Sequence, residues 1–359
     1  MNFELSDDQV ALQEAARALL DGSAAPEQVR AVVDAGGGLD QALWRAMSDQ
    51  GWTAIEVPES DGGLGLGAVE VAVLAEEIGR HVGPAPFRSS VLALDALRGG
   101  GDIERARRVA DGAVACVAWS RDPTAVRADE TRGRWKLTGR ADPTLYAPSA
   151  ELAVVAASTD DAPALFAVDL DTASSSEPAM DRTRELGWLA FDGINATRLG
   201  GSDFVERLLD RGATFTAAEL LGASARVLDL AVEYAKDRVQ FGRPIGSFQA
   251  VKHRCADMLV DVEGMRSAVY WAAWCVGADD PERSIASSSA KLWSADASKR
   301  VMASALQVHG GIGFTWEHDL HLFMKRAQLD QVSFGDAAFH RDRLAALLRA
   351  KVEAGESVL

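Results

Sequence analysis

The spacing of apolar and polar residues changes twice along the chain. In the first stretch, apolar residues recur at helical spacing in QVALQEAARALLDG, LDQALWRAMSDQGW and GAVEVAVLAEEIGRHVG. Ser6 is the expected N-cap of the first helix, followed by Asp7 and Asp8, and Gly22 is its expected end. The turn-rich segment VPESDGGLGLG separates two of the helices. Residues 1–112 are therefore predicted to form an N-terminal α-helical domain.

From residue 113 to residue 200 the pattern is that of strands. The runs AVACVAWS, GRWKLTG, LAVVAAS and ALFAVDL are short, rich in Val, Leu, Trp and Phe, and each is followed by turn residues. Their spacing is typical of antiparallel strands and not of alternating strands and helices. Residues 113–200 are therefore predicted to form a central β-barrel or β-sandwich domain.

Helical spacing returns near Asp203 and continues almost to the end of the chain. Breaks are expected at residues 241–246, 277–281, 310–315 and 333–336, which leaves four or five long helices. Residues 201–359 are predicted to form a C-terminal helical bundle. The fold class is α+β: an N-terminal helical domain, a central antiparallel β domain and a C-terminal four-helix bundle.

Composition narrows the class of protein. The 359 residues carry a net charge of −16 with a pI of about 4.8, which disfavours nonspecific binding to nucleic acid or to an anionic membrane surface. The three cysteines are scattered without a CxxC pair, as expected for buried thiols in a reducing compartment. The N-terminus lacks the pattern of a signal peptide, and the apolar runs are too short to span a membrane. A cytoplasmic protein is expected.

Two of the helix breaks contain residues that a simple turn does not need. RVQFGRPIG, residues 238–246, holds Arg238 and Phe241 beside its glycines and proline. An arginine at a helix C-terminus is favourable for any function. In the second break, Gln307 precedes Gly310 and Gly311, and a glycine-rich turn can simply end a helix. Together, however, the two breaks indicate close approach of a ligand to the backbone.

The segments RVQFGRPIGSFQAVKH and QVHGGIGFTWEHDLHLFMKRA resemble the acyl-CoA dehydrogenase family, and the resemblance extends over the whole chain. It implies an FAD-dependent enzyme in which these segments grip the FAD diphosphate and adenosine across a subunit interface, while the flavin lies in the neighbouring subunit. A guanidinium suits a diphosphate, and glycine turns expose backbone N–H groups to it. The FAD-binding residues that the resemblance implies are Arg238, Phe241, Ile245, Phe248, Gln307, Gly310 and Gly311.

The sequence departs from the family where the resemblance places the proton-abstracting glutamate. At one of the two family positions stands Phe334, and at the other stand Gly212 and Ala213. None of these side chains accepts a proton. Asp336 and Glu219 lie near these positions and are alternative bases, although acidic residues in a loop or on a helix face are more often simply solvated.

The β domain departs from the family as well. The acidic Gly-Ser loop and the W-x-T segment that embrace the flavin in relatives are not recognisable in WSRDPTAVRADETRGRWKLTGRADPTLYAPSAELAVV. The chain's own flavin pocket is therefore predicted to be degraded, whereas the segments that reach into a neighbour's site are predicted to be intact.

Other patterns in the sequence give weaker evidence of a functional site. His318 and His321, beside Glu317, lack further Cys or His ligands, so a surface or interface role is expected and no metal site. His253 and His340 are expected to be packed or solvated. Neither a G-x-S-x-G nucleophile motif nor a G-x-G-x-x-G dinucleotide motif occurs.

These observations favour the supporting subunit of a heteromeric acyl-CoA dehydrogenase. The resemblance implies α,β-desaturation of a CoA thioester, with a steroid side chain or another bulky acyl group as substrate. The partner would be a homologous catalytic subunit, in a heterodimer or heterotetramer, or a second copy of this chain. An acceptor similar to electron-transfer flavoprotein would take the electrons. Two alternatives remain: a homomeric enzyme with Asp336 or Glu219 as base, and a structural subunit without flavin contact.

Overall fold

The computed structural model describes residues 4–170 and 174–357. They form two compact units, each assembled from separate stretches of the sequence. The bundle unit comprises the residues up to Pro26, Ala68–Gly83 and the residues from Ala213 on. The sheet unit comprises Glu27–Gly67 and Pro84–Gly212.

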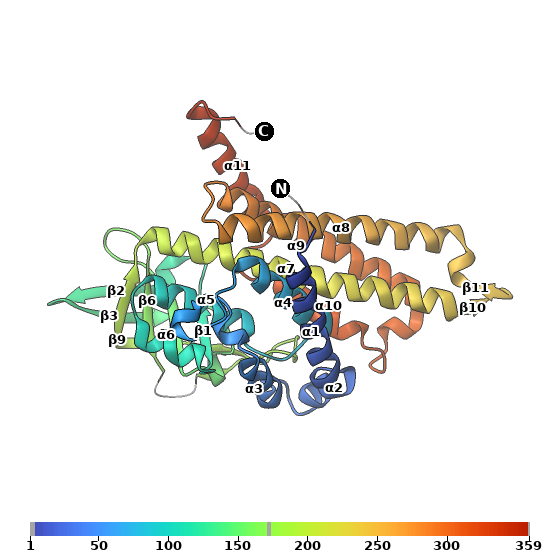
Figure 1. Cartoon of the computed structure of the whole chain (residues 1–359), viewed down its shortest axis with the longest axis horizontal. Helices are drawn as coiled ribbons and strands as arrows, with labels where there is room; N and C mark the ends of the chain where they lie inside the picture. Colours follow the sequence, from blue (N-terminus) through green and yellow to red (C-terminus); the bar gives the residue numbers. More distant parts are fainter. Residues whose placement is uncertain (1–3, 171–173, 358–359) are drawn as a thin grey trace. The chain divides into compact units, whose positions relative to one another are not determined.

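The bundle unit is helical, and its long helices α7 to α11 follow one another along the chain (Figure 1). Figure 1 shows α8 and α9 lying alongside each other, and α10 and α11 pack on α9. The helices of this unit are α1 (Asp7–Ser23), α4 (Ala68–His81), α7 (Ser202–Asp237, of which the part from Ala213 belongs here), α8 (Gln249–Gly277), α9 (Arg283–His309), α10 (Leu320–Val332) and α11 (Ala337–Glu353).

The start of α1 confirms the predicted cap, whereas its end differs from the prediction. Ser6 accepts a hydrogen bond from the backbone N–H of Gln9, whose side chain accepts one from the Ser6 N–H. The helix continues through Gly22 to Ser23, because this glycine keeps a negative φ and does not end the helix. The chain turns just before Pro26, the first residue of α2, where a proline is favourable.

The middle of α4 packs against α7 at backbone distance. A β-carbon at Gly222 of α7 would overlap the Glu76 carbonyl oxygen, and one at Gly79 of α4 would overlap the Glu219 carbonyl oxygen. Two glycines on facing helix surfaces therefore allow the crossing.

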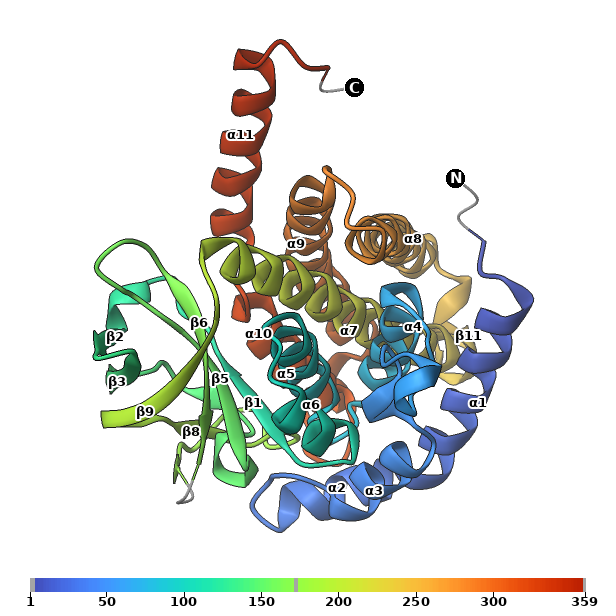
Figure 2. The same ribbon diagram turned by 60° about the vertical axis from the view of Figure 1, so that its left-hand side comes forward.

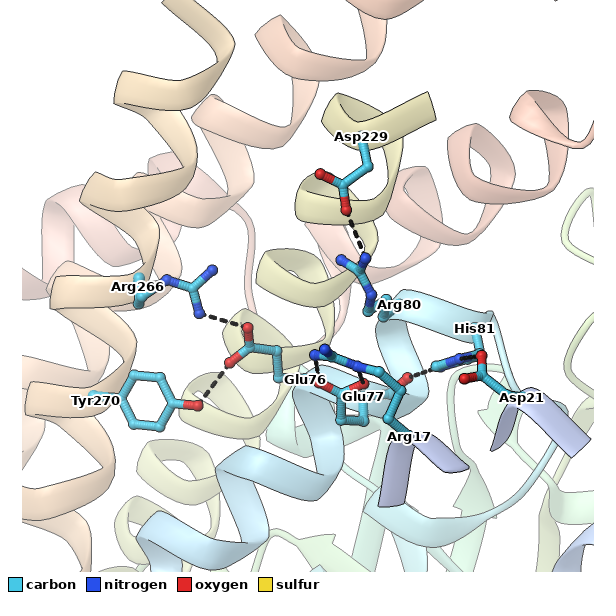
Figure 3. A network of polar contacts seen from close by, with 9 residues as sticks. All are labelled: Arg17, Asp21, Glu76, Glu77, Arg80, His81, Asp229, Arg266 and Tyr270. Carbon is cyan, nitrogen blue, oxygen red and sulfur yellow. Dashed lines mark hydrogen bonds and ion pairs between the residues drawn. The ribbon is translucent and has the colours of Figure 1, made fainter. Parts of the chain in front are cut away.

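Two consecutive glutamates of α4 are buried and bind different helices (Figure 3). Glu76 accepts hydrogen bonds of 2.6 Å from Arg266 and from the Tyr270 hydroxyl, both on α8. Glu77 accepts two from the Arg17 guanidinium of α1, at 2.6 and 3.0 Å. Because both charges are paired and hydrogen-bonded, the carboxylates fix the helices that surround α4. The pairs Arg80–Asp229 and His81–Asp21 extend this network.

The sheet unit is built around a six-stranded sheet with the order β1-β5-β6-β9-β3-β2. Its strands are β1 (Ala115–Ala118), β2 (Val126–Thr131), β3 (Arg134–Arg140), β5 (Leu152–Ala157), β6 (Ala164–Asp169) and β9 (Ala190–Gly200). A smaller sheet, in the order β4-β8-β7, contains β4 (Thr144–Leu145), β7 (Ser175–Ser176) and β8 (Leu186–Trp188). The four predicted runs correspond to β1, β3, β5 and β6.

Helices cover part of the large sheet. Figure 2 shows α5 (Phe87–Gly99) and α6 (Ile103–Ala110) beside β1, and α5 contacts β1, β5 and β9. The unit also holds α2 (Pro26–Asp34), of which Pro26 is grouped with the bundle unit, and α3 (Gln41–Asp49). All six residues of β5 are buried, so this strand lies in the core.

The predicted fold class is confirmed, with one difference in strand direction. β1 pairs with β5 in parallel, whereas the other strand pairs are antiparallel. The chain changes from helix to strand after Ala110 and back to helix after Gly200. The division into three domains at 112/113 and 200/201 stays a prediction. No helix among the described residues is long and apolar enough to cross a membrane.

Candidate functional site

The first predicted break is a tight β-hairpin between α7 and α8. β10 (Val239–Gln240) pairs with β11 (Arg243–Pro244), and the Ile245 N–H donates to the Arg238 carbonyl at 2.8 Å. Phe241 and Gly242 form the tip with φ of 53° and 78°, as in a type I′ turn. A bulky residue is strained in this conformation. Phe241 is nevertheless 92% exposed, so packing within the described chain does not explain its presence.

The hairpin side chains are organised around Phe248, the N-cap residue of α8. The Phe241 ring stands edge-on to the Phe248 ring at 6.1 Å, and the Arg243 guanidinium lies 4.2 Å above it. Ile245 and Phe248 are half-buried and form the base of the hairpin, whereas Arg238 and Arg243 are exposed. Arg243 was missed by sequence reasoning, although its place directly after the Phe-Gly tip was a usable signal.

The second break follows the C-terminus of α9. Gly310, with φ of 62°, begins the short 3-10 helix η6 (Gly310–Phe314). No described atom lies within 4 Å of where a β-carbon would stand on Gly310 or Gly311. Gln307 is exposed one turn earlier, and Phe314 is 75% exposed. The backbone is therefore accessible at this helix end.

An aromatic contact brings the two breaks together. Tyr234 lies one helical turn before Arg238, and its ring stacks on the His309 ring with centroids 4.8 Å apart. His309 is the last residue of α9 and directly precedes Gly310. The end of α7 and the end of α9 are therefore neighbours within the bundle unit. We call the two breaks, residues 238–248 and 307–314, the clasp.

The clasp combines groups that suit a nucleotide diphosphate. Arg238 and Arg243 supply exposed guanidinium groups, and the glycine turn leaves open space beside the backbone of Gly310 and Gly311, where a ligand can approach closely. Within the described part of the chain, no ion pair or hydrogen bond engages the Arg238 guanidinium. Phe241 and Phe314 add exposed aromatic surface. Such a surface can contact one side of an anionic, aromatic ligand. A second surface is needed to enclose the other side.

The turn between α10 and α11 carries Phe334 and is held from several sides. The fully buried Lys291 of α9 donates to the Gln331 and Gly335 carbonyls at 3.0 and 2.7 Å. His340 Nε2 donates to the Phe334 carbonyl at 2.8 Å. Burial lowers the pKa of His340 to about 3, so the ring is neutral. Phe334 itself has a φ of 53°.

The two alternative carboxylates have different surroundings. Asp336 is the N-cap of α11 and accepts a hydrogen bond of 2.8 Å from the Phe339 N–H. Glu219 is only 2% exposed, on α7 where α4 crosses it. The capping role explains why an acidic residue follows the turn, because Asp is a favoured N-cap. Both assignments as a base stay predictions.

The segment in which the family's flavin-embracing loop is not recognisable includes the connection before β2, which is short. Only residues 119–125 join β1 to β2, and they contain the 3-10 turn Pro123–Ala125, with Asp122 accepting a hydrogen bond from the Thr124 N–H. Between β4 and β5 the chain passes through Tyr146, a buried residue with a φ of 57°. That the chain's own flavin pocket is degraded stays a prediction.

The histidines near η6 take part in aromatic stacks. The His318 ring meets His309 at 4.5 Å, and His321 stacks on Trp316 at 4.3 Å. His318 precedes α10 and His321 lies within it, so the two histidines do not share a helix face. Among the described residues, no group of three or more His, Cys, Asp or Glu side chains is arranged to hold a metal ion.

Comparisons with known proteins match most of the chain and agree on one family. The family models described as "Acyl-CoA dehydrogenase, N-terminal domain" and "Acyl-CoA dehydrogenase, C-terminal domain" match residues 6–109 and 200–348. The acyl-CoA dehydrogenase IpdE2 of Mycolicibacterium smegmatis is 36% identical over 90% of this chain and 93% of its own. The acyl-CoA dehydrogenase FadE27 of Mycobacterium tuberculosis is 32% identical over 89% of this chain and 91% of its own.

Two solved complexes are similar in structure. A chain of the ChsE4-ChsE5 complex from Mycobacterium tuberculosis matches with a TM-score of 0.91 at 30% identity, covering 97% of this chain and 99% of that chain. A chain of the Tcur3481-Tcur3483 steroid ACAD, in its G363A variant, matches with a TM-score of 0.90 at 28% identity, covering the same shares.

Proposed function

The chain belongs to the acyl-CoA dehydrogenase family of FAD-dependent oxidoreductases, and from that premise we propose that it is the supporting subunit of a heteromeric acyl-CoA dehydrogenase. Its role is to complete the FAD site of a homologous catalytic subunit. The proposal rests on one combined observation. The clasp is exposed and organised, while a phenylalanine stands where the resemblance places the catalytic glutamate.

The clasp residues fit FAD. Arg238 and Arg243 would hold the diphosphate, the open turn at Gly310 and Gly311 would let the diphosphate lie close to the backbone, and Gln307 would bind at the adenosine end. Phe241 and Phe248, in edge-to-face contact, offer aromatic surface. Bound FAD supplies the acceptor for the hydride that leaves the β-carbon of the thioester. The exposure of the clasp supports binding between two subunits.

The work of this chain is therefore binding and orientation. Phe334 offers no lone pair at the position of the base, and its turn is held by Lys291 and His340 in a fixed conformation. Proton removal from the α-carbon is assigned to the partner subunit, which would carry the glutamate.

The substrate and partners follow from the relatives' names. One similar structure is described as a steroid ACAD, and one as a complex of two differently named chains. We assign to the assembly a CoA thioester with a steroid side chain or another bulky acyl group. The assembly would be a heterodimer or heterotetramer, and an acceptor similar to electron-transfer flavoprotein would reoxidise it.

A homomeric enzyme with a relocated base is the second candidate. Asp336 supports it, because this half-buried carboxylate lies two residues from Phe334 on the same turn. Against it, the carboxylate already caps α11. Glu219 is weaker because its side chain is buried at the crossing of two helices. A structural subunit without flavin contact leaves the exposed Phe241 without a role.

The test is to purify the chain alone and together with its genomic neighbours, and to measure flavin absorbance per chain. We expect a colourless lone chain and about one FAD per heterodimer, since binding energy is shared across the interface. In the complex, Arg238→Ala should lower FAD content, whereas Arg254→Ala, an exposed arginine of α8 outside the clasp, should not. A yellow lone chain that reduces an acceptor with acyl-CoA would establish the homomeric enzyme instead.

A further inference from the structure

We propose that His309 is a positioning residue that sets the spacing between the two segments of the clasp. Its ring lies between Tyr234 of α7 and His318 of the segment before α10. This inference rests on the proposed function, because the spacing matters only if both segments hold one ligand.

The α7 side of the stack fixes Arg238. The Arg238 N–H donates to the Tyr234 carbonyl at 2.9 Å, which is the last regular helical bond before the hairpin. Residues four apart lie on the same face of a helix. Tyr234 is half-buried, and its ring is nearly parallel to that of His309, with 23° between the planes. A ring fixed at Tyr234 therefore fixes the start of the hairpin.

The α9 side of the stack fixes Gly310. His309 is buried, and its Nδ1–H donates to the Ala305 carbonyl one turn earlier at 2.8 Å. Because the next residue leaves the helix at a φ of 62°, the imidazole stands at the point where the chain turns into the glycine segment. Any rotation of the ring would be transmitted to the N–H groups of that segment.

His318 closes the stack from a third element. Its ring meets that of His309 edge to face at 66°, and its Nδ1 accepts a hydrogen bond of 3.1 Å from the Leu320 N–H at the start of α10. The segment from Gly310 to His318 is thus anchored at both ends by imidazoles in contact. The end of α7, the end of α9 and the segment before α10 therefore meet at one ring.

Burial lowers the pKa of His309, so its ring is neutral at physiological pH. A neutral ring contacts Tyr234 and His318 without adding a further positive charge to the clasp, which already contains two guanidinium groups. The acceptor capacity of its Nε2 has no partner among the described residues. The role we assign to His309 is carried by the position of the ring and not by this nitrogen.

The experiment measures FAD affinity in the complex of this chain with its partner subunit. We expect His309→Ala to weaken FAD binding about tenfold, because the ring contact that holds the two segments of the clasp at a fixed spacing is lost. His309→Phe keeps a ring of similar size and should retain most of the affinity. The decisive readout is coupling: Arg238→Ala should cost much less affinity in the His309→Ala background than in the native chain, since a displaced arginine contributes little.

The outcomes separate this inference from the proposed function. If Arg238→Ala weakens FAD binding but His309→Ala does not, or if the two losses simply add, His309 does not position the clasp and the FAD site stands. If Arg238→Ala has no effect, the FAD site fails and the inference fails with it. If His309→Ala does not assemble, Tyr234→Ala removes the same stack from the half-buried side and is judged by the same coupling.

Discussion

Glu76 shows how one buried residue depends on its donors. Its carboxylate is held by Arg266 and Tyr270 in the interior of the bundle unit (Figure 3). Burial raises the pKa of Tyr270 far above its usual value, and the neighbouring Glu76 raises it further, so the phenol stays protonated and donates.

Tyr270→Phe should therefore lower the free energy of unfolding by about 1–3 kcal/mol, the cost of an unsatisfied buried acceptor. Denaturant unfolding of the purified chain measures this. The matched control is Glu263→Ala, which removes the exposed second partner of Arg266, 3.5 Å away. An exposed pair contributes little, so the control should change stability by less than about 0.5 kcal/mol. Equal losses in both variants would show that the Tyr270 hydroxyl does not stabilise Glu76.

At the residue scale, individual site residues could be predicted from the sequence, whereas contacts between two residues could not. Arg238 and Phe241 were recognisable because a turn does not require them, and Gly310 because glycines accumulate there. The stack of Tyr234 on His309 was not predictable, since neither residue is unusual in its own helix and only the packing of α7 against α9 brings them together.

The turn between α10 and α11 is an element whose stability depends on pH. His340 is fully buried, its Nε2–H binds the Phe334 carbonyl, and its pKa is lowered to about 3. Lys291 and Arg343 repel a proton on the ring, whereas Asp336 favours it less strongly. In the unfolded chain the histidine titrates near its ordinary value of about 6.5.

His340 should therefore destabilise the fold as the pH falls. Below a pH of about 6.5 the unfolded state binds a proton that the folded state refuses until about pH 3. Stability contributed by the neutral ring is complete above this window and is lost through it, by about 2 kcal/mol at pH 5. Unfolding measured at pH 7 and pH 5 should show a smaller loss for His340→Gln than for the native chain. The exposed His253→Gln should leave the loss unchanged, and an equal loss in all three would contradict the assignment.

At the element scale, local pattern predicted helices and buried strands. The helix breaks lie within a few residues of their expected places, because glycine and proline mark them. β9 was not predicted from the sequence. Phe191 and Leu199 are buried, but most residues of this strand are not, so apolar and polar residues do not alternate along it. The parallel pairing of β1 with β5 depends on how the chain returns to the sheet, which no local pattern records.

At the scale of the molecule, the units cut across the order of the sequence. The bundle unit takes in α1 and α4 from the N-terminal part of the chain, while the sheet unit takes in α2, α3, α5 and α6. Patterns read along the sequence predict contiguous domains, because they carry no information on which distant helices pack together. The buried carboxylates of Glu77 and Glu76 pair with the partly exposed Arg17 and Arg266 and so join such distant segments within the bundle unit.

At the scale of the whole molecule, the exposed clasp predicts that the chain associates with a partner subunit. Phe241 is 92% exposed at a turn that favours Asn-Gly over Phe-Gly. A strained aromatic residue with so little of its surface covered adds little to the folding of the described chain, so its ring is expected to be buried by a partner. Phe241→Asn creates the preferred turn sequence and removes only the ring.

We therefore expect Phe241→Asn to leave the thermal stability of the lone chain unchanged or slightly raised, and to weaken its association with the partner subunit by about tenfold. Thermal unfolding and analytical ultracentrifugation measure the two effects. Ile103→Ser replaces another exposed apolar residue, 57% exposed at the start of α6 in the sheet unit, and should alter neither. If Phe241→Asn destabilised the lone chain, Phe241 would contribute to folding and not only to association. If association were unaffected, the partner would not cover the hairpin, and the clasp would have to bind its ligand without a second subunit.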